Sequence, residues 1–208
     1  DAAALAGRAG SATRAGQAGS PAVPGAADAA TPAAHEPRVI GLAGWSGAGK
    51  TTVMAGLIPC LIGRGVSVST IKHAHHAFDL DTPGKDSHAH RAAGARQVLI
   101  GSALRWALLT ELRGAPEPTL AEMLARLDPV DLILVEGFKR EPIPKIEIHR
   151  AANGKPWRFP EDPLVRAIAA DVPPPCDLPH VALDDIAGIA DLALAHAAPL
   201  SALLPAAG

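Results

Sequence analysis

The sequence predicts an α/β domain with a mostly parallel sheet, helices on both faces and extra antiparallel strands. Short apolar runs such as residues 39–43 and 132–135 are typical of strands that are buried on both sides. Segments with helical periodicity alternate with these runs, which favours parallel strands joined by helical crossovers. Glycines and prolines lie between the segments, where the chain is expected to turn.

The first half of the domain is expected to begin with a strand at residues 39–43 and a helix at residues 50–63. Residues 66–72 alternate between Val or Thr and small polar residues, which predicts a second strand. Residues 73–83 have no period and many polar side chains, so we expect a loop there. Residues 85–94 are predicted to form a helix that ends at a glycine.

Two strands joined by a Gly-Ser turn are expected at residues 97–100 and 104–109. Thr119 is predicted to cap a helix whose apolar residues recur at three- and four-residue spacing. Residues 131–136 form the most hydrophobic segment of the chain, which predicts a central strand.

The last part of the domain is predicted to contain two more strands and one helix. Residues 145–149 alternate in polarity and residues 165–170 are short and apolar, so both are expected as strands. Residues 150–160 contain Gly and Pro and are expected as an irregular loop. Asp184 or Asp185 is predicted to cap a final helix.

The two ends of the chain are expected to lie outside this domain. Residues 1–37 contain 15 Ala, 5 Gly and 4 Pro, and their only large aliphatic residues are Leu5 and Val23. Two such side chains bury too little apolar surface to offset the entropy lost on ordering the segment. We therefore expect a flexible tail at residues 1–37, a nucleotide-binding domain at residues 38–200 and a short C-terminal tail at residues 201–208.

Composition argues against several classes of partner. The formal net charge is −2 and Tyr is absent, so neither a basic surface for nucleic acid nor base-stacking aromatics are expected. No apolar run approaches the ~20 residues that cross a bilayer. Cys60 and Cys176 are isolated, which is typical of small core residues in a reducing compartment. The sequence therefore predicts a soluble, cytoplasmic protein.

A complete phosphate-binding motif, GxxxxGK[ST], lies between the first strand and the first helix. Its glycines let consecutive backbone N–H groups point at phosphate oxygens, and the helix that follows adds its positive N-terminal end. Within it, Lys50 is expected to meet the β- and γ-phosphates, Thr51 to bind Mg²⁺, and Thr52 to reach the α-phosphate. The motif consists of Gly44, Trp45, Ser46, Gly47, Ala48, Gly49, Lys50 and Thr51. It predicts a P-loop NTPase fold that binds a purine nucleoside triphosphate with magnesium.

Glu136 ends the most hydrophobic strand, where a P-loop protein usually places the acid that holds magnesium or its waters. We expect it to act there as a catalytic and metal-binding group. Asp131 begins the same strand and should lie at the opposite edge of the sheet, as a cap or a solvated charge.

The polar loop after the second strand is a further candidate. Asp86 or Asp81 is predicted to meet magnesium or the attacking water, which makes Asp86 a candidate catalytic residue. A transition-metal site formed by His73, His75 and His76 and a solvated loop without ligands are the alternatives.

The sequence gives less information about which purine base the nucleotide carries. The chain has no Asn-Lys-x-Asp box. Asp171 follows a predicted strand, and either accepts hydrogen bonds from guanine N1 and N2 or caps the turn formed by the three prolines at residues 173–175.

Several motifs together resemble the molybdopterin-guanine dinucleotide biosynthesis adapter (MobB) family. The resemblance runs from about residue 38 to residue 196. It includes the P-loop, residues 71–76 (IKHAHH), 79–87 (DLDTPGKDS), 92–95 (AAGA), 105–108 (RWAL), 134–139 (LVEGFK), 145–147 (KIE) and 169–171 (AAD). The long N-terminal tail departs from the family pattern.

The resemblance implies a homodimeric GTP-binding protein with weak GTPase activity. It also implies a role in assisting the guanylyltransferase MobA, with other molybdenum cofactor proteins, in joining GMP to molybdopterin. Carried over by position, residues 44–52 would hold phosphate and magnesium, and Glu136 would be the acid at the end of the strand. Whether the chain is an enzyme stays open, and it would be at most a slow GTPase.

Two other functions are compatible with the residues. One is a metabolite kinase in which the His-rich loop and residues 136–139 bind an acceptor hydroxyl. The other is direct binding of molybdopterin, with Lys72, Lys85 and Lys139 as phosphate contacts.

For hydrolysis of GTP, the candidates for positive charge that would stabilise the transition state are Arg91, Arg96 and Arg140. Strand pairing at residues 104–112 and 145–149 across a twofold axis would cover exposed edges and form the dimer.

Overall fold

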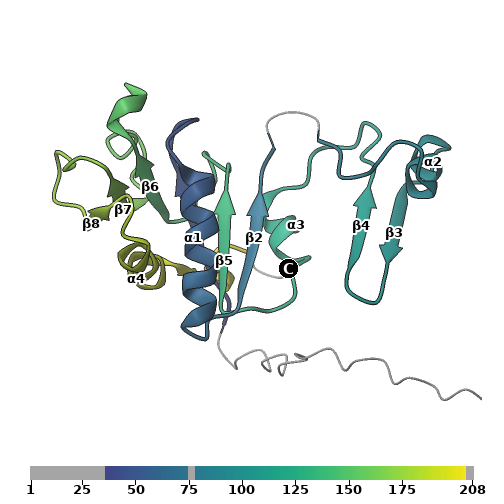
Figure 1. Cartoon of the computed structure of the whole chain (residues 1–208), viewed down its shortest axis with the longest axis horizontal. Coiled ribbons are helices and arrows are strands. Elements are labelled where there is room, and N and C mark those ends of the chain that lie inside the picture. Colours follow the sequence, from purple (N-terminus) through teal and green to yellow (C-terminus); the bar gives the residue numbers. More distant parts are fainter. Residues whose placement is uncertain (1–35, 75–77, 205–208) are drawn as a thin grey trace, which may run out of the picture. The chain divides into compact units, whose positions relative to one another are not determined.

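The computed structural model describes residues 36–74 and 78–204 (Figure 1). Most of the predicted 1–37 tail therefore lies outside the described residues. The α-helices are α1 (Lys50–Gly63), α2 (Asp86–Ala92), α3 (Leu120–Leu124) and α4 (Ile186–His196). The strands are β1 (Arg38–Ala43), β2 (Val68–Lys72), β3 (Gln97–Gly101), β4 (Trp106–Thr110), β5 (Leu132–Glu136), β6 (Lys145–His149), β7 (Val165–Ala170), β8 (His180–Ala182) and β9 (Ala198–Pro199). Strands and α-helices alternate from β1 to α2, whereas β5, β6, β7 and β8 follow one another without an α-helix between them.

The main sheet has the order β2-β5-β1-β6-β7-β8, and every neighbouring pair in this order is parallel. The short strand β9 pairs antiparallel with the start of β1. Leu42 is in register with Glu136 on one side, and Ala43 is in register with Glu147 on the other. The P-loop that follows β1 therefore leaves the sheet between two carboxylates.

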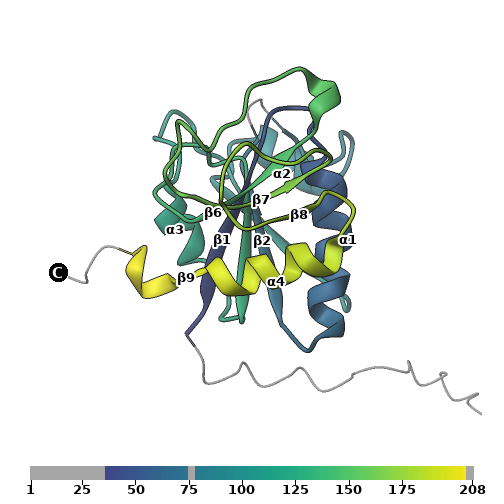
Figure 2. The ribbon, with the colours of Figure 1, turned by 90° about the vertical axis from the view of Figure 1, so that its left-hand side faces the viewer.

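Helices cover both faces of this sheet, as predicted (Figure 2). On one face α1 and α4 pack against the sheet through Leu57, Leu61 and Ile189, all fully buried. On the other face the short helix α3 packs through Leu120 and Leu124. Leu203 and Leu204, which fall in the segment predicted as a C-terminal tail, pack against that second cluster. None of the helices in the described part of the chain is long and apolar enough to cross a membrane.

The predicted antiparallel strands are β3 and β4, which form a separate two-stranded sheet next to α2. Leu99 and Leu108 are directly opposite one another, and Trp106 lies two residues from Leu108 on the same face. These side chains are exposed: the solvent reaches 67% of Leu99, 69% of Trp106 and 48% of Leu108. We call these three residues the apolar hairpin face.

The strand predicted at residues 145–149 is confirmed as β6. All five of its residues are buried, including Lys145, Glu147 and His149, although they alternate in polarity. The strand lies between β1 and β7, so its polar residues find partners inside the protein. Lys145 Nζ, for example, lies 3.1 Å from Asp162 Oδ2. Residues 145–149 therefore offer no free edge, and the dimer argument based on them is wrong.

Asp131 is neither a helix cap nor a free surface charge. Its Oδ2 accepts hydrogen bonds from the backbone N–H of Ser67 at 2.8 Å and from the Ser67 hydroxyl at 2.6 Å. The Ser67 hydroxyl oxygen in turn accepts from the Asp131 N–H at 2.9 Å. The carboxylate thus fixes the starting points of β2 and β5 next to one another, at the edge of the sheet opposite the P-loop.

Helix α4 offers a test of the capping argument, because two neighbouring aspartates precede it. Only Asp185 acts as the cap, accepting a hydrogen bond from the Gly188 N–H at 2.8 Å. We expect Asp185→Ala to lower the free energy of unfolding by about 1 kcal/mol. Asp184→Ala, at an exposed position beside it, should change stability by less than about 0.5 kcal/mol. Urea unfolding of both variants measures this, and equal losses would contradict the assignment.

Candidate functional site

The P-loop has a backbone that only glycine adopts readily at three positions. Gly44, Gly47 and Gly49 have φ angles of 151°, 81° and 97°. A Cβ atom at Gly44 would also collide with the carbonyl oxygen of Ile148. The loop therefore passes directly against β6, and it turns sharply into α1 at Gly49. This is the backbone geometry that the motif predicts for a phosphate-binding loop, and we call residues 44–51 the cradle.

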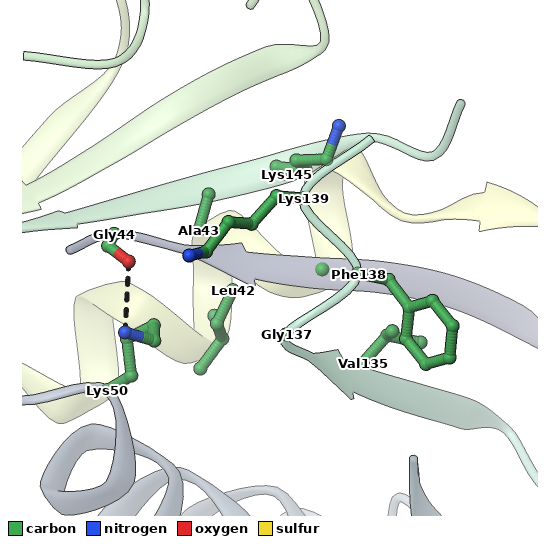
Figure 3. A pocket seen from close by; sticks show the side chains of 10 residues that line it. Leu42, Ala43, Gly44, Lys50, Val135, Gly137, Phe138, Lys139 and Lys145 are labelled. Atoms are coloured by element: carbon green, nitrogen blue, oxygen red, sulfur yellow. Dashed lines mark hydrogen bonds between the residues drawn. The ribbon is translucent and has the colours of Figure 1, made fainter. Parts of the chain in front are cut away.

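Lys50, the first residue of α1, has its ammonium group inside this cradle (Figure 3). Its Nζ donates hydrogen bonds to the carbonyl oxygens of Gly44 and Trp45, each at 3.0 Å. The side chain is thus folded back over the loop, so that its charge lies where the motif brings phosphate oxygens.

The pKa of Lys50 is lowered from its ordinary value. Burial lowers its pKa most strongly, and Lys139, Arg158 and Lys72 lower the pKa further. Glu136 opposes them, because a nearby carboxylate favours the charged ammonium. Figure 3 shows Lys139 extending toward the P-loop from the segment after β5. A concentration of positive charge at one end of the sheet suits a polyanionic ligand.

Glu136 lies at the position predicted for a magnesium-binding acid. It ends β5 beside Leu42, its side chain is only 13% exposed, and its Oε2 lies 4.0 Å from Lys72 Nζ. Thr51 follows Lys50 at the start of α1 and is exposed. Mg²⁺ takes few protein ligands alongside phosphate oxygens and water. The Thr51 hydroxyl and Glu136 suit such an ion chemically, because both are oxygen donors, Thr51 follows Lys50 in the chain and Glu136 acts electrostatically on Lys50.

A segment that sequence reasoning treated only as a loop holds the P-loop from outside. We call residues 150–160 the clasp loop. The Trp45 indole N–H donates to the carbonyl oxygen of Pro156 at 2.8 Å, and the Asn153 amide donates to the carbonyl oxygen of Ser46 at 3.0 Å. The Arg158 guanidinium carbon lies 5.3 Å from the centre of the Trp45 ring, within cation–π range. The clasp loop therefore fixes the tip of the P-loop.

The clasp loop is itself anchored by a buried charge. Glu147 on β6 is fully buried, and its two carboxylate oxygens accept hydrogen bonds from the backbone N–H groups of Arg158 and Phe159 at 2.8 and 2.9 Å. His149 stacks on the Trp157 ring with 3.6 Å between centroids. The alternating polarity of residues 145–149 is the only sequence signal at this anchor, and it does not show that Glu147 is buried.

An open cleft of about 560 Å³ lies beside the first turn of α1. Gly49 and Thr52 line one side of it, and Arg150 and Asp171 contribute polar groups from the ends of β6 and β7. The Asp171 Oδ1 accepts a hydrogen bond from the Ala151 N–H at 2.8 Å, so the carboxylate does not cap the proline turn. Asp171 remains exposed at the cleft, next to the phosphate cradle.

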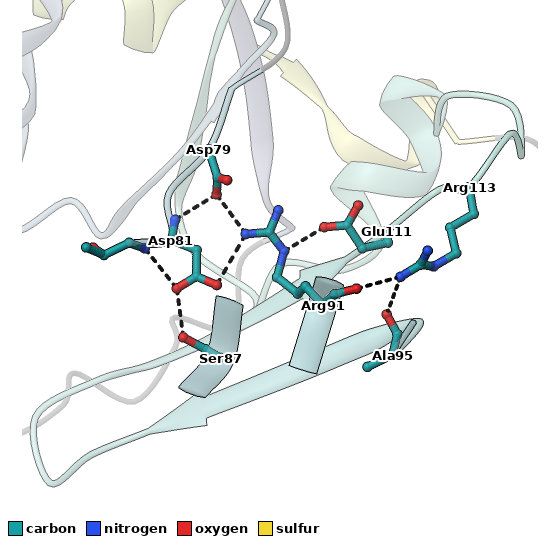
Figure 4. A network of polar contacts seen from close by, with 8 residues as sticks. Asp79, Asp81, Ser87, Arg91, Ala95, Glu111 and Arg113 are labelled. Carbon is teal, nitrogen blue, oxygen red and sulfur yellow. Dashed lines mark hydrogen bonds and ion pairs between the residues drawn. The ribbon is translucent and has the colours of Figure 1, made fainter. Parts of the chain in front are cut away.

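The acidic residues of the polar loop take part in a separate network (Figure 4). Arg91 on α2 binds Asp79 at 2.7 Å, Asp81 at 3.2 Å and Glu111 at 2.6 Å. The hydrogen bond from Arg91 lowers the pKa of Asp79, whereas that from Ser87 is the main cause of the lowered pKa of Asp81. Arg91 and Asp81 thus hold α2 and the loop together.

Asp86 is the first residue of α2, is exposed, and does not line the cleft beside α1. Its catalytic role stays a prediction. Of the three histidines considered for a metal, His75 and His76 lie outside the described residues, and His73 Nε2 is 2.7 Å from Glu117 Oε1. The described residues contain no group of three or more His, Cys, Asp or Glu side chains arranged to hold a metal.

The family model "Molybdopterin guanine dinucleotide synthesis protein B" (MobB) matches residues 39–171 of this chain. The chain is 45% identical over 156 residues to the molybdopterin-guanine dinucleotide biosynthesis adapter protein of Escherichia coli, covering 74% of this chain and 89% of that protein. It is 44% identical to the protein of the same name from Haemophilus influenzae, covering 74% of this chain and 85% of the relative.

Solved structures agree on the fold. A crystal structure of molybdopterin-guanine biosynthesis protein B superposes with a TM-score of 0.61 at 22% identity, covering 76% of this chain and 98% of that one. Bacillus subtilis MobB superposes with a TM-score of 0.58 at 24% identity, covering 77% and 98%. The predicted mostly parallel P-loop fold is therefore confirmed.

Proposed function

This chain belongs to the MobB family, and from that premise we propose that it is a GTP-binding adapter with slow GTPase activity. It acts in the biosynthesis of the guanine dinucleotide form of the molybdenum cofactor. The observation that carries the proposal is the cradle at the end of β1, where three glycines have positive φ and the Lys50 ammonium donates to the carbonyl oxygens of Gly44 and Trp45. The family relationship supports the adapter role, and the cradle supports the nucleotide.

Each part of the cradle has a distinct task. Backbone N–H groups of residues 44–51 bind the phosphates, and Lys50 compensates the charge of the β- and γ-phosphates. The Thr51 hydroxyl and Glu136 hold Mg²⁺, which supplies Lewis acidity at the γ-phosphate when bound. Lys139 and Arg158 add positive charge to the same end of the sheet. Trp45 keeps the loop against the clasp loop, so that the N–H groups stay aligned.

Hydrolysis is expected to be slow, because two groups that would accelerate it are engaged elsewhere. Arg91 is held by three carboxylates, and Asp81 accepts hydrogen bonds from Ser87 and Arg91. In a single-turnover assay with the full chain, GTP and Mg²⁺, we expect far less than one turnover per second. Turnover of many per second without a partner, or release of GDP that depends on a small acceptor, would contradict the adapter role and favour a kinase.

Guanine is proposed to lie in the cleft beside α1, with Asp171 accepting from N1–H and N2–H. Asp171→Asn keeps an oxygen for the Ala151 N–H but removes the charge. We expect affinity for a GTP analogue to fall by about 1.5–3 kcal/mol, or roughly 10- to 100-fold, with little change for the ATP analogue. Calorimetric titration measures this. Asp177→Asn, exposed on the neighbouring loop, is the matched control and should bind like the wild type.

The proposed partner is the guanylyltransferase MobA together with other molybdenum cofactor proteins. The names of the E. coli and H. influenzae relatives describe adapters for this pathway, and the adapter role requires at least one enzyme to act on.

We also propose that the chain is a homodimer that pairs through the apolar hairpin face of Leu99, Trp106 and Leu108. Exposed apolar side chains in one stripe mark an interaction surface, and a two-stranded sheet alone is marginally stable. Leu99→Glu should convert the dimer to a monomer in light scattering at micromolar concentration. Ile62→Glu, an exposed apolar position on α1, should leave the dimer intact. A wild-type monomer would contradict the proposal.

A further inference from the structure

A second cleft, of about 570 Å³, lies along the segment that follows β5, on the side of that segment away from the P-loop. Gly137, Phe138 and Lys139 line both this cleft and the small cavity behind the P-loop. Figure 3 shows Lys139 extending toward Gly44 while the Phe138 ring lies on the other side of the same segment. The second cleft is therefore a direct neighbour of the phosphate cradle, separated from it by three residues.

The cleft has an aromatic wall. The His73 and Phe138 rings are 4.9 Å apart between centroids and tilted by 39°. Their positions are fixed by the backbone, because the His73 N–H donates to the Glu136 carbonyl oxygen at 2.8 Å. A Cβ atom on Gly137 would lie 2.8 Å from the His73 carbonyl oxygen, so the two segments touch without room for a side chain. A flat ring would have a rigid surface to pack against.

The polar groups of the cleft are divided by charge. Lys139 and Arg140, after β5, contribute two exposed cations. Glu117, before α3, contributes a carboxylate whose Oε1 lies 2.7 Å from His73 Nε2 while its side chain stays 61% exposed. A carboxylate with two oxygens pairs well with two adjacent N–H donors, whereas exposed Arg and Lys suit a phosphate.

We propose that this cleft binds a phosphorylated compound with a 2-amino-4-oxopyrimidine ring, the edge that pterins and guanine share. The ring lies along His73 and Phe138, its adjacent N–H and NH₂ donors meet the Glu117 carboxylate, and its phosphate meets Arg140 and Lys139. This inference rests on the proposed function, because it names the second small molecule that a nucleotide-binding adapter of this pathway holds beside its triphosphate.

The full chain is first saturated with a non-hydrolysable GTP analogue and Mg²⁺, and then titrated with (pterin-6-yl)methyl phosphate. Pterin fluorescence reports stacking, and we expect saturable quenching. GMP is tested as a competitor of the pterin. Displacement at similar concentration assigns the cleft to the shared ring edge, and no displacement assigns it to pterins alone.

Glu117→Gln should weaken pterin binding about 10- to 100-fold, because it removes the charge and one of the two acceptors. Glu161→Gln, an exposed residue in the loop before β7, is the matched control and should bind like the wild type. Affinity for the GTP analogue should be the same in both variants, which shows that they are folded.

The inference is overturned if neither compound binds the saturated chain, or if both variants bind the pterin like the wild type. Failure of the proposed function gives a different result: the chain does not bind the GTP analogue, yet quenching that depends on Glu117 persists. Loss of cleft binding with intact GTP-analogue binding contradicts the second cleft alone.

Discussion

Replacing Lys50 with alanine is expected to abolish nucleotide binding at practical concentrations. The ammonium lies in the cradle between the carbonyl oxygens of Gly44 and Trp45, and no neighbouring cation has the same position. Truncating one member of a desolvated charge pair costs about 3 kcal/mol or more, equivalent to at least roughly 100-fold in affinity. Titration calorimetry with a GTP analogue and Mg²⁺ measures the loss. Lys85→Ala, an exposed lysine before α2, is the control and should bind normally.

The lowered pKa of Lys50 gives the same prediction a pH dependence. Between the folded pKa and the ordinary value of 10.5, the native state holds fewer protons than the unfolded chain. Stability therefore rises with pH across that window, because the buried charge is relieved. Affinity for the triphosphate should fall across the same window as Lys50 becomes neutral. Unchanged affinity of Lys50→Ala at neutral pH would contradict the assignment of the cradle.

Replacing Glu147 with alanine is expected to have the largest effect on stability. The substitution leaves the backbone N–H groups of Arg158 and Phe159 without their acceptor and opens a void in the core. Each unsatisfied buried donor costs about 1–3 kcal/mol, so a total loss of about 3 kcal/mol or more is expected. Because the clasp loop then loosens its hold on Trp45, affinity for the GTP analogue should fall as well.

Urea unfolding and calorimetry on the same samples separate the two effects of Glu147. Glu147→Gln retains the shape and one acceptor, so its loss of stability should be intermediate. Glu161→Ala removes an exposed carboxylate nearby and should be neutral within about 0.5 kcal/mol. A Glu147→Ala variant as stable as the wild type would show that the clasp loop is held by other contacts.

Local signals in the sequence predict the centre of this fold well. The P-loop motif specifies a turn, its glycines and the start of α1 within eight residues, and all of them are found as expected. The Thr119 cap is confirmed, with Thr119 and Glu122 forming a reciprocal capping box. Glu136 is found beside the P-loop, because parallel strands bring their carboxyl ends to one edge of the sheet.

Features that depend on partners far away in the chain cannot be predicted from the local sequence. The pattern of β6 does not show that the strand is buried on both faces, because an alternating strand looks alike whether its polar residues face water or buried partners. The clasp loop acts on Trp45 and Ser46 across more than 100 residues of sequence, and the partners of Glu147 are backbone groups. The short strands β8 and β9 have no periodic signal of their own, since they are defined by the neighbours they pair with.

In the candidate site, too, some residues can be predicted from local sequence signals and others only from the folded structure. The P-loop residues and Glu136 follow from motif and strand order, whereas the positions of Lys139 and Arg158 near Lys50 emerge only from the folded arrangement of charges. The ion pairs of Arg91 could not be predicted, because its three carboxylate partners come from the polar loop and from the segment after β4; its role as a source of transition-state charge stays a prediction. The second cleft is formed by segments around residues 73, 117 and 137, which no spacing rule connects.

The cradle at the end of β1 is proposed to bind guanosine triphosphate with magnesium. Calorimetric titration of the full chain with non-hydrolysable GTP and ATP analogues, each with Mg²⁺ and with EDTA, tests it directly. We expect one GTP analogue per chain, binding that weakens on chelation, and at least about tenfold weaker binding of the ATP analogue. Absence of binding by either analogue, or equal affinity for both, would contradict the claim.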